Sequence, residues 1–503
     1  MIPVIDIFAG PGGLAEGFSA ITDDGGRCFA MRLSIEMESY AFATLKLRSF
    51  CRQFPPGHLP DEYYDFVKGK LSLDELGAAC PEQLMAASQE TWQVELGNCP
   101  YEEVDDRIKK ALASAQKWIL IGGPPCQAYS YAGIVGNRTN RQYTPDKDKH
   151  YTLYEEYIRI MAVHKPTVFV LENVPGMLFA KLSGQNIFPT ILKWLSKPGD
   201  FIEESSNHGY RLFNIDGLLC DPTETNPRKF IVQCEDYGIP QARHRVIIIG
   251  IRNDIIENSR FVAQPKESYM TVASVLNGLP ILRSSLSKEP DSLSAWRGVF
   301  IEAIKNGLHK DIGRSFGKEL GQIFHDAATA LVAVSPDSSG RDYIQGQFIP
   351  EKMADWYIDP RLGGALHHEA RPQIREDLIR YLLVACHAKL RGFSPKVYAF
   401  PEKLLPIHKN ALSGDFRERF KALKLSTPAH TIISHLSKDG HGFIHPDITQ
   451  CRSLTPREAA RLQTFPDNYF FFGGRAAKFR QIGNAVPPLL ACKIARSIIH
   501  LLR

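Results

Sequence analysis

Five short, almost uninterrupted runs of apolar residues constrain the fold of this chain more than any other feature of its sequence. Each run has the length of a β-strand, and stretches with helical periodicity separate the runs. Strands that are apolar throughout are typical of a parallel sheet covered by helices on both faces. We therefore predict an α/β fold with a doubly wound, mostly parallel sheet. The predicted strands are Val4–Phe8, Cys28–Ile35, Trp118–Ile121, Val168–Leu171 and Val246–Gly250.

The middle of the chain follows a different pattern. Residues 281–425 contain helical patterns such as Arg375–Leu383 but few strand signals. Residues 426–503 return to a compact pattern, with Thr455 placed to cap a helix and an apolar-periodic final helix at Ala485–Leu502. We therefore predict a sheet domain made of residues 1–280 and 426–503, with a smaller domain inserted at 281–425.

Charge is spread unevenly over the inserted domain. The whole chain has a formal net charge of +5, which permits a polyanionic partner without requiring one. Residues 361–425 hold 13 Lys and Arg against 6 Asp and Glu, a net of +7, whereas residues 281–360 have a net of −2 (9 against 11). The basic half is where we expect a phosphate backbone to bind. A solvated helical surface explains the charge equally well.

The sequence argues against a secreted or membrane protein. Its start, Met1–Asp6, has no basic segment of a secretory signal, and runs such as Val246–Ile251 are far too short to span a bilayer. The ten cysteines are scattered, and no pair has the C-x-x-C spacing of a zinc or redox site. We expect a reducing compartment, hence a cytoplasmic protein, and no bound metal.

A glycine-rich turn follows the first predicted strand. The segment Gly10-Pro11-Gly12-Gly13-Leu14-Ala15 satisfies the pattern G-x-G-x-x-A, in which glycines let the backbone approach a ligand closely. Glu36 ends the next strand, where a carboxylate can bind two ribose hydroxyls. The pair predicts a nucleoside cofactor, with a nicotinamide dinucleotide and S-adenosylmethionine both compatible. A tight turn without a ligand is the alternative.

A single cysteine follows the third strand in an unusual setting. Pro124 and Pro125 stiffen the chain directly before Cys126, and the polar Gln127 and Ser130 follow it. A thiolate is a strong nucleophile, and this setting favours presentation of the thiol rather than burial. Most lone cysteines are structural, which is the alternative here.

Two further polar motifs lie near predicted strands. Glu172-Asn173 ends the fourth strand, and a partly desolvated carboxyl there can hold a proton near neutral pH. Arg243 and Arg245 alternate in Gln241–Arg245, so both side chains are predicted on one face, where they suit phosphate or a carbonyl oxygen. The alternatives are a helix-capping carboxylate and a surface ion pair.

Together and in this order, the motifs resemble those of the cytosine-C5 DNA methyltransferases. Two motifs near the end of the chain extend the resemblance, Arg457–Asp467 and Gln481–Pro488. One motif alone could arise by chance, but the ordered set is highly specific. The resemblance covers residues 1–280 and 426–503, and it implies a Rossmann-like, S-adenosylmethionine-dependent methyltransferase fold. Residues 281–425 would then be the target-recognition domain.

The resemblance also implies a cofactor and its site. The cofactor is S-adenosylmethionine, released as S-adenosylhomocysteine, and the last helix would complete its pocket. Glu95 is a weak candidate for an acid that contacts adenine. The implied cofactor-binding residues are Phe8, Ala9, Gly10, Gly12, Gly13, Glu36, Met37, Pro124, Asn484 and Val486.

The implied reaction methylates C5 of a cytosine flipped out of a specific DNA sequence. Cys126 would add to C6 of the base, Glu172 would bind or protonate N3, and Arg243 with Arg245 would hold O2. Gln127 and Ser130, with both arginines, would also contact the DNA. In the inserted domain the candidate phosphate contacts are Arg371, Arg375, Lys389, Arg391 and Lys396.

We expect a monomeric enzyme that acts on double-stranded DNA at the nucleoid, of restriction-modification, orphan or phage-defence type. Three alternatives stay open. A nicotinamide-dependent oxidoreductase fits the glycine turn but gives the Cys126 loop no role. An RNA methyltransferase of the same fold shares the catalytic motifs. A non-catalytic DNA-binding relative would have no use for Cys126 and Glu172.

Overall fold

The computed structural model describes residues 1–124, 153–182, 185–202, 208–224, 226–256, 261–407 and 419–503. The chain forms two compact units. The first unit comprises Met1–Tyr63, Ser72–Tyr269 and Ala485–Arg503, and the second comprises Tyr64–Leu71 and Met270–Asn484. Among the helices of these described ranges, none is long and apolar enough to cross a membrane.

The first unit is built on a nine-stranded sheet in the order β11-β10-β14-β7-β6-β1-β4-β5, with β12 paired to β14. The strands β5, β4, β1, β6 and β7 are parallel. This confirms the predicted α/β fold with a mostly parallel sheet. The strands are β1 (Ile2–Ile7), β4 (Phe29–Glu36), β5 (Thr91–Gln93), β6 (Ile119–Gly122), β7 (Val168–Asn173), β10 (Tyr210–Phe213), β11 (Leu219–Cys220), β12 (Ile231–Gln233) and β14 (His244–Arg252).

The last predicted strand is present, but it runs against its neighbours. β14 is antiparallel to β7, and Ile247 lies opposite Glu172 in the register. An apolar run does not reveal strand direction, because a central strand is buried on both faces either way. As a result, the Gln241–Arg245 motif precedes a strand, but it lies at the sheet edge where β7 ends. This motif therefore shares one edge of the sheet with the end of β7, although it comes before its own strand.

Helices cover the sheet because alternate strand residues point to each face. On one face, Leu33, Leu120 and Leu171 join a buried apolar cluster with the helices α6, α8 and α9. Each such side chain contributes about 1.5–3 kcal/mol when fully buried. The helices of this unit include α1 (Gly13–Ser19), α2 (Ser39–Arg52), α4 (Leu73–Ala79), α5 (Pro81–Glu90), α6 (Tyr101–Leu112), α8 (Leu153–His164), α9 (Phe188–Ser196), α10 (Asn253–Ile256) and α19 (Pro488–Ile498).

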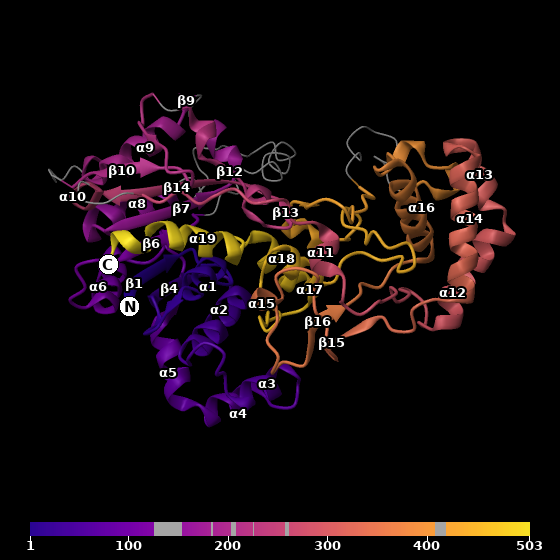
Figure 1. Ribbon diagram of the computed structural model, residues 1–503, viewed down its shortest axis with the longest axis horizontal. Helices are drawn as coiled ribbons and strands as arrows, with labels where there is room; N and C mark the ends of the chain where they lie inside the picture. Colours follow the sequence, from indigo (N-terminus) through magenta and orange to yellow (C-terminus); the bar gives the residue numbers. More distant parts are fainter. Residues whose placement is uncertain (125–152, 183–184, 203–207, 225, 257–260, 408–418) are drawn as a thin grey trace. The chain divides into compact units, whose positions relative to one another are not determined.

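The first and last helices of this unit pack closely together, as the indigo and yellow ribbons in Figure 1 show. A Cβ added at Gly13 would lie 2.3 Å from Val486 O, and one at Gly17 would lie 2.2 Å from Pro488 O. Both glycines are therefore required for α1 to approach the C-terminal segment. The final helix begins at Pro488, after the expected start at Ala485, because Pro488 occupies its first turn.

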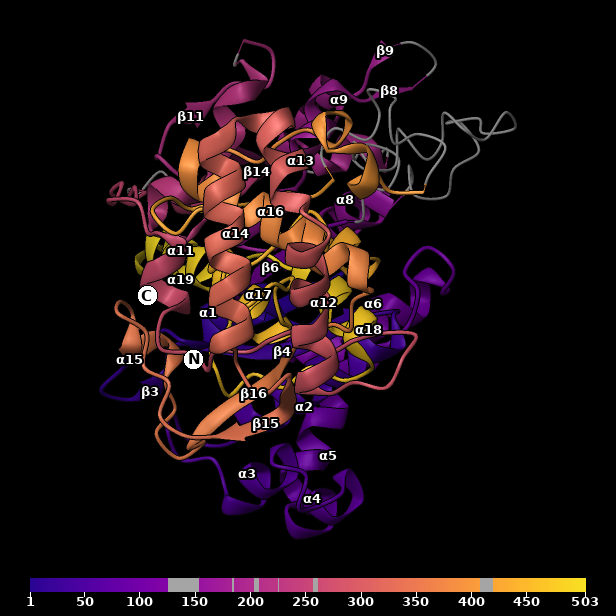
Figure 2. The same cartoon turned by 90° about the vertical axis from the view of Figure 1, so that its right-hand side faces the viewer.

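The second unit is mainly helical. Figure 2 shows α12, α13, α14 and α16 side by side, and their inward residues, such as Trp296, Phe324 and Tyr381, form one buried cluster. The predicted helix at Arg375–Leu383 is confirmed as part of α16. The elements of this unit include α11 (Val272–Leu276), α12 (Leu293–Lys305), α13 (Leu308–Phe316), α14 (Lys318–Ala333), β15 (Gly340–Gln345), α15 (Ala354–Tyr357), β16 (Gly364–Glu369), α16 (Arg375–Arg391), α17 (Pro456–Leu462) and α18 (Arg475–Asn484).

The boundaries between the units differ from those expected at 280/281 and 425/426. Residues 426–484 pack with the helical unit rather than with the sheet. Buried arginines on α17 provide the reason: Arg457 donates to Leu366 O at 2.9 Å, and Arg461 donates to Val275 O at 3.0 Å. The predicted cap of α17 is confirmed, since Thr455 and Glu458 form a capping box.

Candidate active site

The glycine turn begins where β1 ends. Phe8 has a φ of +57°, a left-handed conformation that is strained for a residue with a side chain. Ala9 N donates to Ile35 O at 2.9 Å, which ties the turn to the end of β4. Gly12, with a φ of +95°, precedes the first residue of α1. Strain of this kind costs about 1–3 kcal/mol and is concentrated at binding sites.

Glu36 faces the same turn. Its Oε2 accepts a hydrogen bond from Gly10 N at 2.8 Å, and its Oε1 accepts one from Glu38 N at 2.7 Å. Burial raises the pKa of Glu36, and these backbone hydrogen bonds oppose the rise. A carboxylate can accept about four hydrogen bonds, so Glu36 retains capacity for hydroxyl groups of a ligand.

The edge beside Glu36 is open. Met37 is 54% exposed, and its carbonyl accepts a hydrogen bond from Gln93 Nε2 at 3.3 Å. Gln93 lies opposite Glu36 in the parallel register, so exposed Glu95 follows β5 at the same edge of the sheet. The sequence did not single out Gln93, because a polar residue at a short edge strand carries no motif.

Gly13 packs against the backbone of the C-terminal segment at Val486 O and leaves no room there for a ligand. Gly13 therefore lets the C-terminal segment pack against the turn. Gly10, by contrast, has a φ of +58° and nothing within 4 Å of an added Cβ. Asn484, the other residue predicted in this segment, is exposed and is the last residue of the second unit.

Glu172, at the end of β7, forms an ion pair with Arg245. Arg245 Nε lies 3.0 Å from Glu172 Oε1, and both side chains are 12% exposed. Burial raises the pKa of Glu172, while the positive charges of Arg245 and Arg243 oppose the rise. The raised pKa shows that burial outweighs the arginines, so this carboxyl binds a proton more readily than a free glutamate.

The segment that leads to Cys126 passes directly over Glu172. A Cβ added at Gly123 would lie 2.7 Å from Glu172 Oε2, so a larger residue here would displace this carboxyl from its position. Asn173 Nδ2 donates to Pro124 O at 3.3 Å. The predicted residues Cys126, Gln127 and Ser130 lie outside the described residues.

The two arginines do not present a matched pair to one ligand. Arg243 is fully buried and donates from Nη2 to Ala485 O at 2.8 Å, whereas Arg245 reaches Glu172. Arg243 lies between β13 (Gln241–Ala242) and β14, outside both strands, so the strand alternation that would place the two side chains together does not apply to it. Arg243 therefore supports the C-terminal segment and adds positive charge near Glu172.

Asp6 is a buried carboxyl that the motifs did not reveal. It lies in β1 with no exposed surface. Burial raises its pKa well above the usual range; Arg52 opposes the rise, and Glu36 and Glu90 add to it. An acid within an apolar strand was the available signal, and this carboxyl lies close enough to Glu36 for the two charges to repel each other.

Comparison with known proteins agrees with this geometry. A family model described as C-5 cytosine-specific DNA methylase matches residues 79–500. The chain belongs to the C-5 cytosine-specific DNA methylase family. The chain is 30% identical to the type II methyltransferase M.Bpa9945I of Bacillus paralicheniformis and 27% identical to the type II methyltransferase M.AgeI of Thalassovita gelatinovora. Each alignment covers 98% of both chains.

A solved structure supports the fold of this C5 methylase. An E. coli prophage-encoded protein described as a DNA modification methyltransferase has a TM-score of 0.52 and 20% identity, covering 100% of this chain and 99% of its own. The chain is therefore an enzyme of the DNA (cytosine-5-)-methyltransferase class with the α/β methyltransferase fold. A nicotinamide-dependent oxidoreductase, which the glycine turn alone allowed, is not what this family contains.

Proposed function

We propose that this methylase forms a covalent bond between Cys126 and C6 of a cytosine in double-stranded DNA, with Glu172 as the acid that assists. The observation that carries the proposal is the contact of Gly123 and Pro124 with the Glu172–Asn173 end of β7. The two residues Gly123 and Pro124, which precede the Cys126 segment, thus lie directly beside the largely buried Glu172 carboxyl. A nucleophile and an acid must lie close together to act on the same cytosine ring.

The chemistry needs these groups because C5 of cytosine is a weak nucleophile. Addition of the Cys126 thiolate to C6 uses the C5–C6 double bond and makes C5 enamine-like. Negative charge then develops over N3 and O2 of the ring. Glu172, whose pKa is raised by burial, protonates or hydrogen-bonds N3, and Arg245 stabilises O2. Loss of the C5 proton after methylation expels the thiolate and restores the ring.

S-adenosylmethionine supplies the electrophilic methyl group when it is bound. The described residues fit such a ligand, because Glu36 keeps acceptor capacity for ribose hydroxyls and the Gly10 side of the turn is open. Met37 provides an exposed apolar face for adenine. By the resemblance, Phe8, Ala9, Gly12, Pro124, Asn484 and Val486 complete the pocket, with Gly13 positioning Val486.

The target base must leave the duplex for both of its faces to be reached, which costs a few kcal/mol. Gln127 and Ser130 would contact the DNA around it. Residues 281–425 choose the target sequence in this proposal. The named relatives are type II methyltransferases, which favours a restriction-modification role over an orphan or defence role. We further propose a monomer in the cytoplasm, at the nucleoid.

A covalent trap tests the nucleophile. Bisulfite sequencing of host DNA after expression first identifies the methylated cytosine. A duplex with 5-fluorocytosine at that position should then form a stable adduct with the wild type, because fluorine cannot leave as a proton. Cys126→Ser should form none and should keep its cofactor affinity.

The matched control is Cys99→Ser, since Cys99 is the most exposed of the described cysteines. This variant should form the adduct as the wild type does. An adduct with Cys126→Ser, or none with the wild type, refutes the mechanism.

An exchange of residues 281–425 for the same region of a relative with a known, different target tests recognition. Methylation should follow the inserted region. If the original target persists, residues 281–425 do not choose the sequence.

A further inference from the structure

The second unit contains a pocket of about 760 Å³. Its walls come from the last residue of α11 and the segment after it (276–281), the C-terminal end of α16, the segment 423–426 and the turn 445–452. The wall at 423–426 is held in place, because Val272 N donates to Thr427 O and Ala273 N donates to Leu425 O, each at 3.0 Å. A pocket of this volume takes a ligand of drug or nucleotide size.

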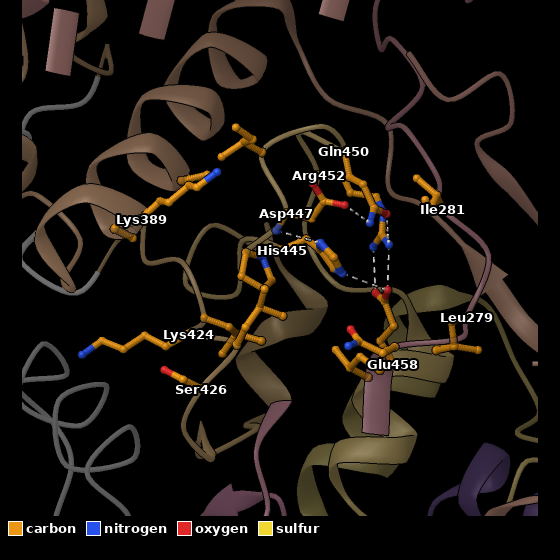
Figure 3. Close-up of a pocket in the computed structure, with 18 of the residues that line it drawn as sticks. Leu279, Ile281, Lys389, Lys424, Ser426, His445, Asp447, Gln450, Arg452 and Glu458 are labelled. Carbon is orange, nitrogen blue, oxygen red and sulfur yellow. Dashed lines mark hydrogen bonds and ion pairs between the residues drawn. The ribbon is translucent and has the colours of Figure 1, made fainter. Parts of the chain in front are cut away.

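The floor of the pocket is a buried polar network. Arg452 donates two hydrogen bonds of 2.7 Å to Glu458. Asp447 N donates to Nδ1 of buried His445 at 3.2 Å, so Nε2 of this imidazole carries the proton. His445 Nε2 faces Glu458 Oε1 at 3.5 Å, which is longer than a good hydrogen bond. Figure 3 shows these side chains together, with Nε2 of His445 directed at the Glu458 carboxylate.

The rim carries two lysines, Lys389 and Lys424, which are exposed. Within the described ranges, neither ammonium has a carboxylate partner. Figure 3 places both lysines on one side of the pocket and the apolar Leu279 and Ile281 on the other. Two uncompensated positive charges beside a pocket attract an anionic group.

Three of the other predicted phosphate contacts of this basic region, all of them arginines, have partners in the described structure. Arg371 donates to Ser437 O at 2.7 Å and to Lys438 O, so it holds a turn. Arg375 pairs with Glu289 at 2.8 Å, and Arg391 lies 3.8 Å from Glu319. Arg371 thus has backbone partners inside the unit, and Arg375 and Arg391 each have a neighbouring carboxylate that partly offsets their charge.

We propose that this pocket binds a nucleotide unit, with its phosphate at Lys389 and Lys424 and its base against Leu279 and Ile281. The apolar side chains of Leu279 and Ile281 offer a surface for a planar ring. The nucleotide belongs either to a DNA strand or to a free nucleotide. The DNA source rests on the proposed function, in which this region recognises the target sequence.

Two kinds of variant separate the effect of the lysine charges from the effect of blocking the pocket mouth. The double variant Lys389→Gln/Lys424→Gln removes both ammonium groups. Ser426→Trp places a bulky neutral side chain at an exposed position on the rim. The matched controls are Lys305→Gln and Ser315→Trp, at exposed positions of α12 and α13 outside the pocket lining. Binding of duplex DNA containing the target is measured over a salt series, and binding of deoxynucleoside monophosphates is measured by calorimetry.

If the nucleotide comes from DNA, the double variant should lower the slope of log affinity against log salt by about one unit, because both lysines hold the same phosphate. Ser426→Trp should weaken DNA binding by about tenfold with an unchanged slope, since it removes no charge. If the nucleotide is free, both variants should lose monophosphate binding and keep DNA affinity. Equal behaviour of pocket variants and controls in both assays overturns the proposal.

The covalent trap keeps this proposal distinct from the catalytic one. At saturating DNA, the pocket variants should still form the 5-fluorocytosine adduct, because their residues take no part in the chemistry. A wild type without an adduct refutes the catalytic proposal but leaves the pocket assays to be judged on their own results.

Discussion

Each unit buries a glutamate against an arginine, and the two pairs differ in what they leave available. In the second unit, Glu458 accepts two hydrogen bonds from Arg452 and a third from Thr455 N at 2.8 Å. Burial opposes its ionisation, but Arg452 holds its pKa far below the usual range. In the first unit, Glu172 Oε1 lies 3.0 Å from Arg245 Nε. Here the effect of burial outweighs the positive charge of the arginine, so the pKa of Glu172 is raised.

The difference shows that burial alone does not determine whether the pKa of a carboxyl is raised or lowered. Glu458 is saturated by donors and stays charged, which suits a structural role between a helix cap and the turn at 445–452. Glu172 is buried with fewer donors, so it can exchange a proton or a hydrogen bond with a substrate. The two sites therefore predict opposite consequences for the same substitution.

The largest effect should come from Glu172→Gln. We expect methyl transfer to fall by about 10²–10⁴-fold, because the amide cannot deliver a proton to the base. The melting temperature should change little by comparison. The measurement is single-turnover methylation at saturating DNA. Glu458→Gln is the matched control, and a larger rate loss in that variant would reverse the assignment of roles.

Glu458→Gln should instead unfold the second unit more easily. Breaking a buried ion pair leaves Arg452 uncompensated and costs about 3–5 kcal/mol. Hydrogen exchange of amides in α17 measures the local stability, with amides of β7 in the first unit as the reference. Equal protection in wild type and variant would contradict the structural role of this pair.

A third acidic residue, Glu36, should show a smaller effect on ligand binding. Glu36→Ala leaves Gly10 N and ribose hydroxyls without an acceptor, so S-adenosylmethionine affinity should fall by about 1–3 kcal/mol. DNA affinity without cofactor should stay the same. Titration calorimetry makes the measurement, and an unchanged cofactor affinity would show that Glu36 has another role.

The smallest effect concerns pH. The lowered pKa of Glu458 stabilises the fold above the ordinary glutamate pKa, and this contribution is lost as pH falls, by about 1.4 kcal/mol per unit. The stability gap between wild type and Glu458→Gln should therefore narrow below about pH 4.3. The raised pKa of Glu172 has the opposite sign, so Glu172→Gln should gain on the wild type as pH rises through that range. Denaturant unfolding at several pH values tests both trends, and parallel curves would contradict them.

Much of the sheet edge that carries Glu36 and Glu172 could be predicted from the sequence. The apolar runs define the strands, and Glu36 and Glu172 each end a strand that the structure confirms as β4 and β7. The capping box of Thr455 and Glu458 is equally local. These features depend on residues within a few positions of one another, so a pattern in the sequence is sufficient to find them.

Only the tertiary structure decided the remaining features, because they depend on contacts between distant residues. The antiparallel direction of β14 brings Arg245 to Glu172, whereas Arg243 turns to Ala485, 242 residues away. Gly13 proves to be a packing position for Val486. The unit boundary follows the hydrogen bonds of Arg457 and Arg461 rather than any change in composition. Strand direction, donor choice and close approach are set by neighbours in space, and a sequence pattern records neighbours only along the chain.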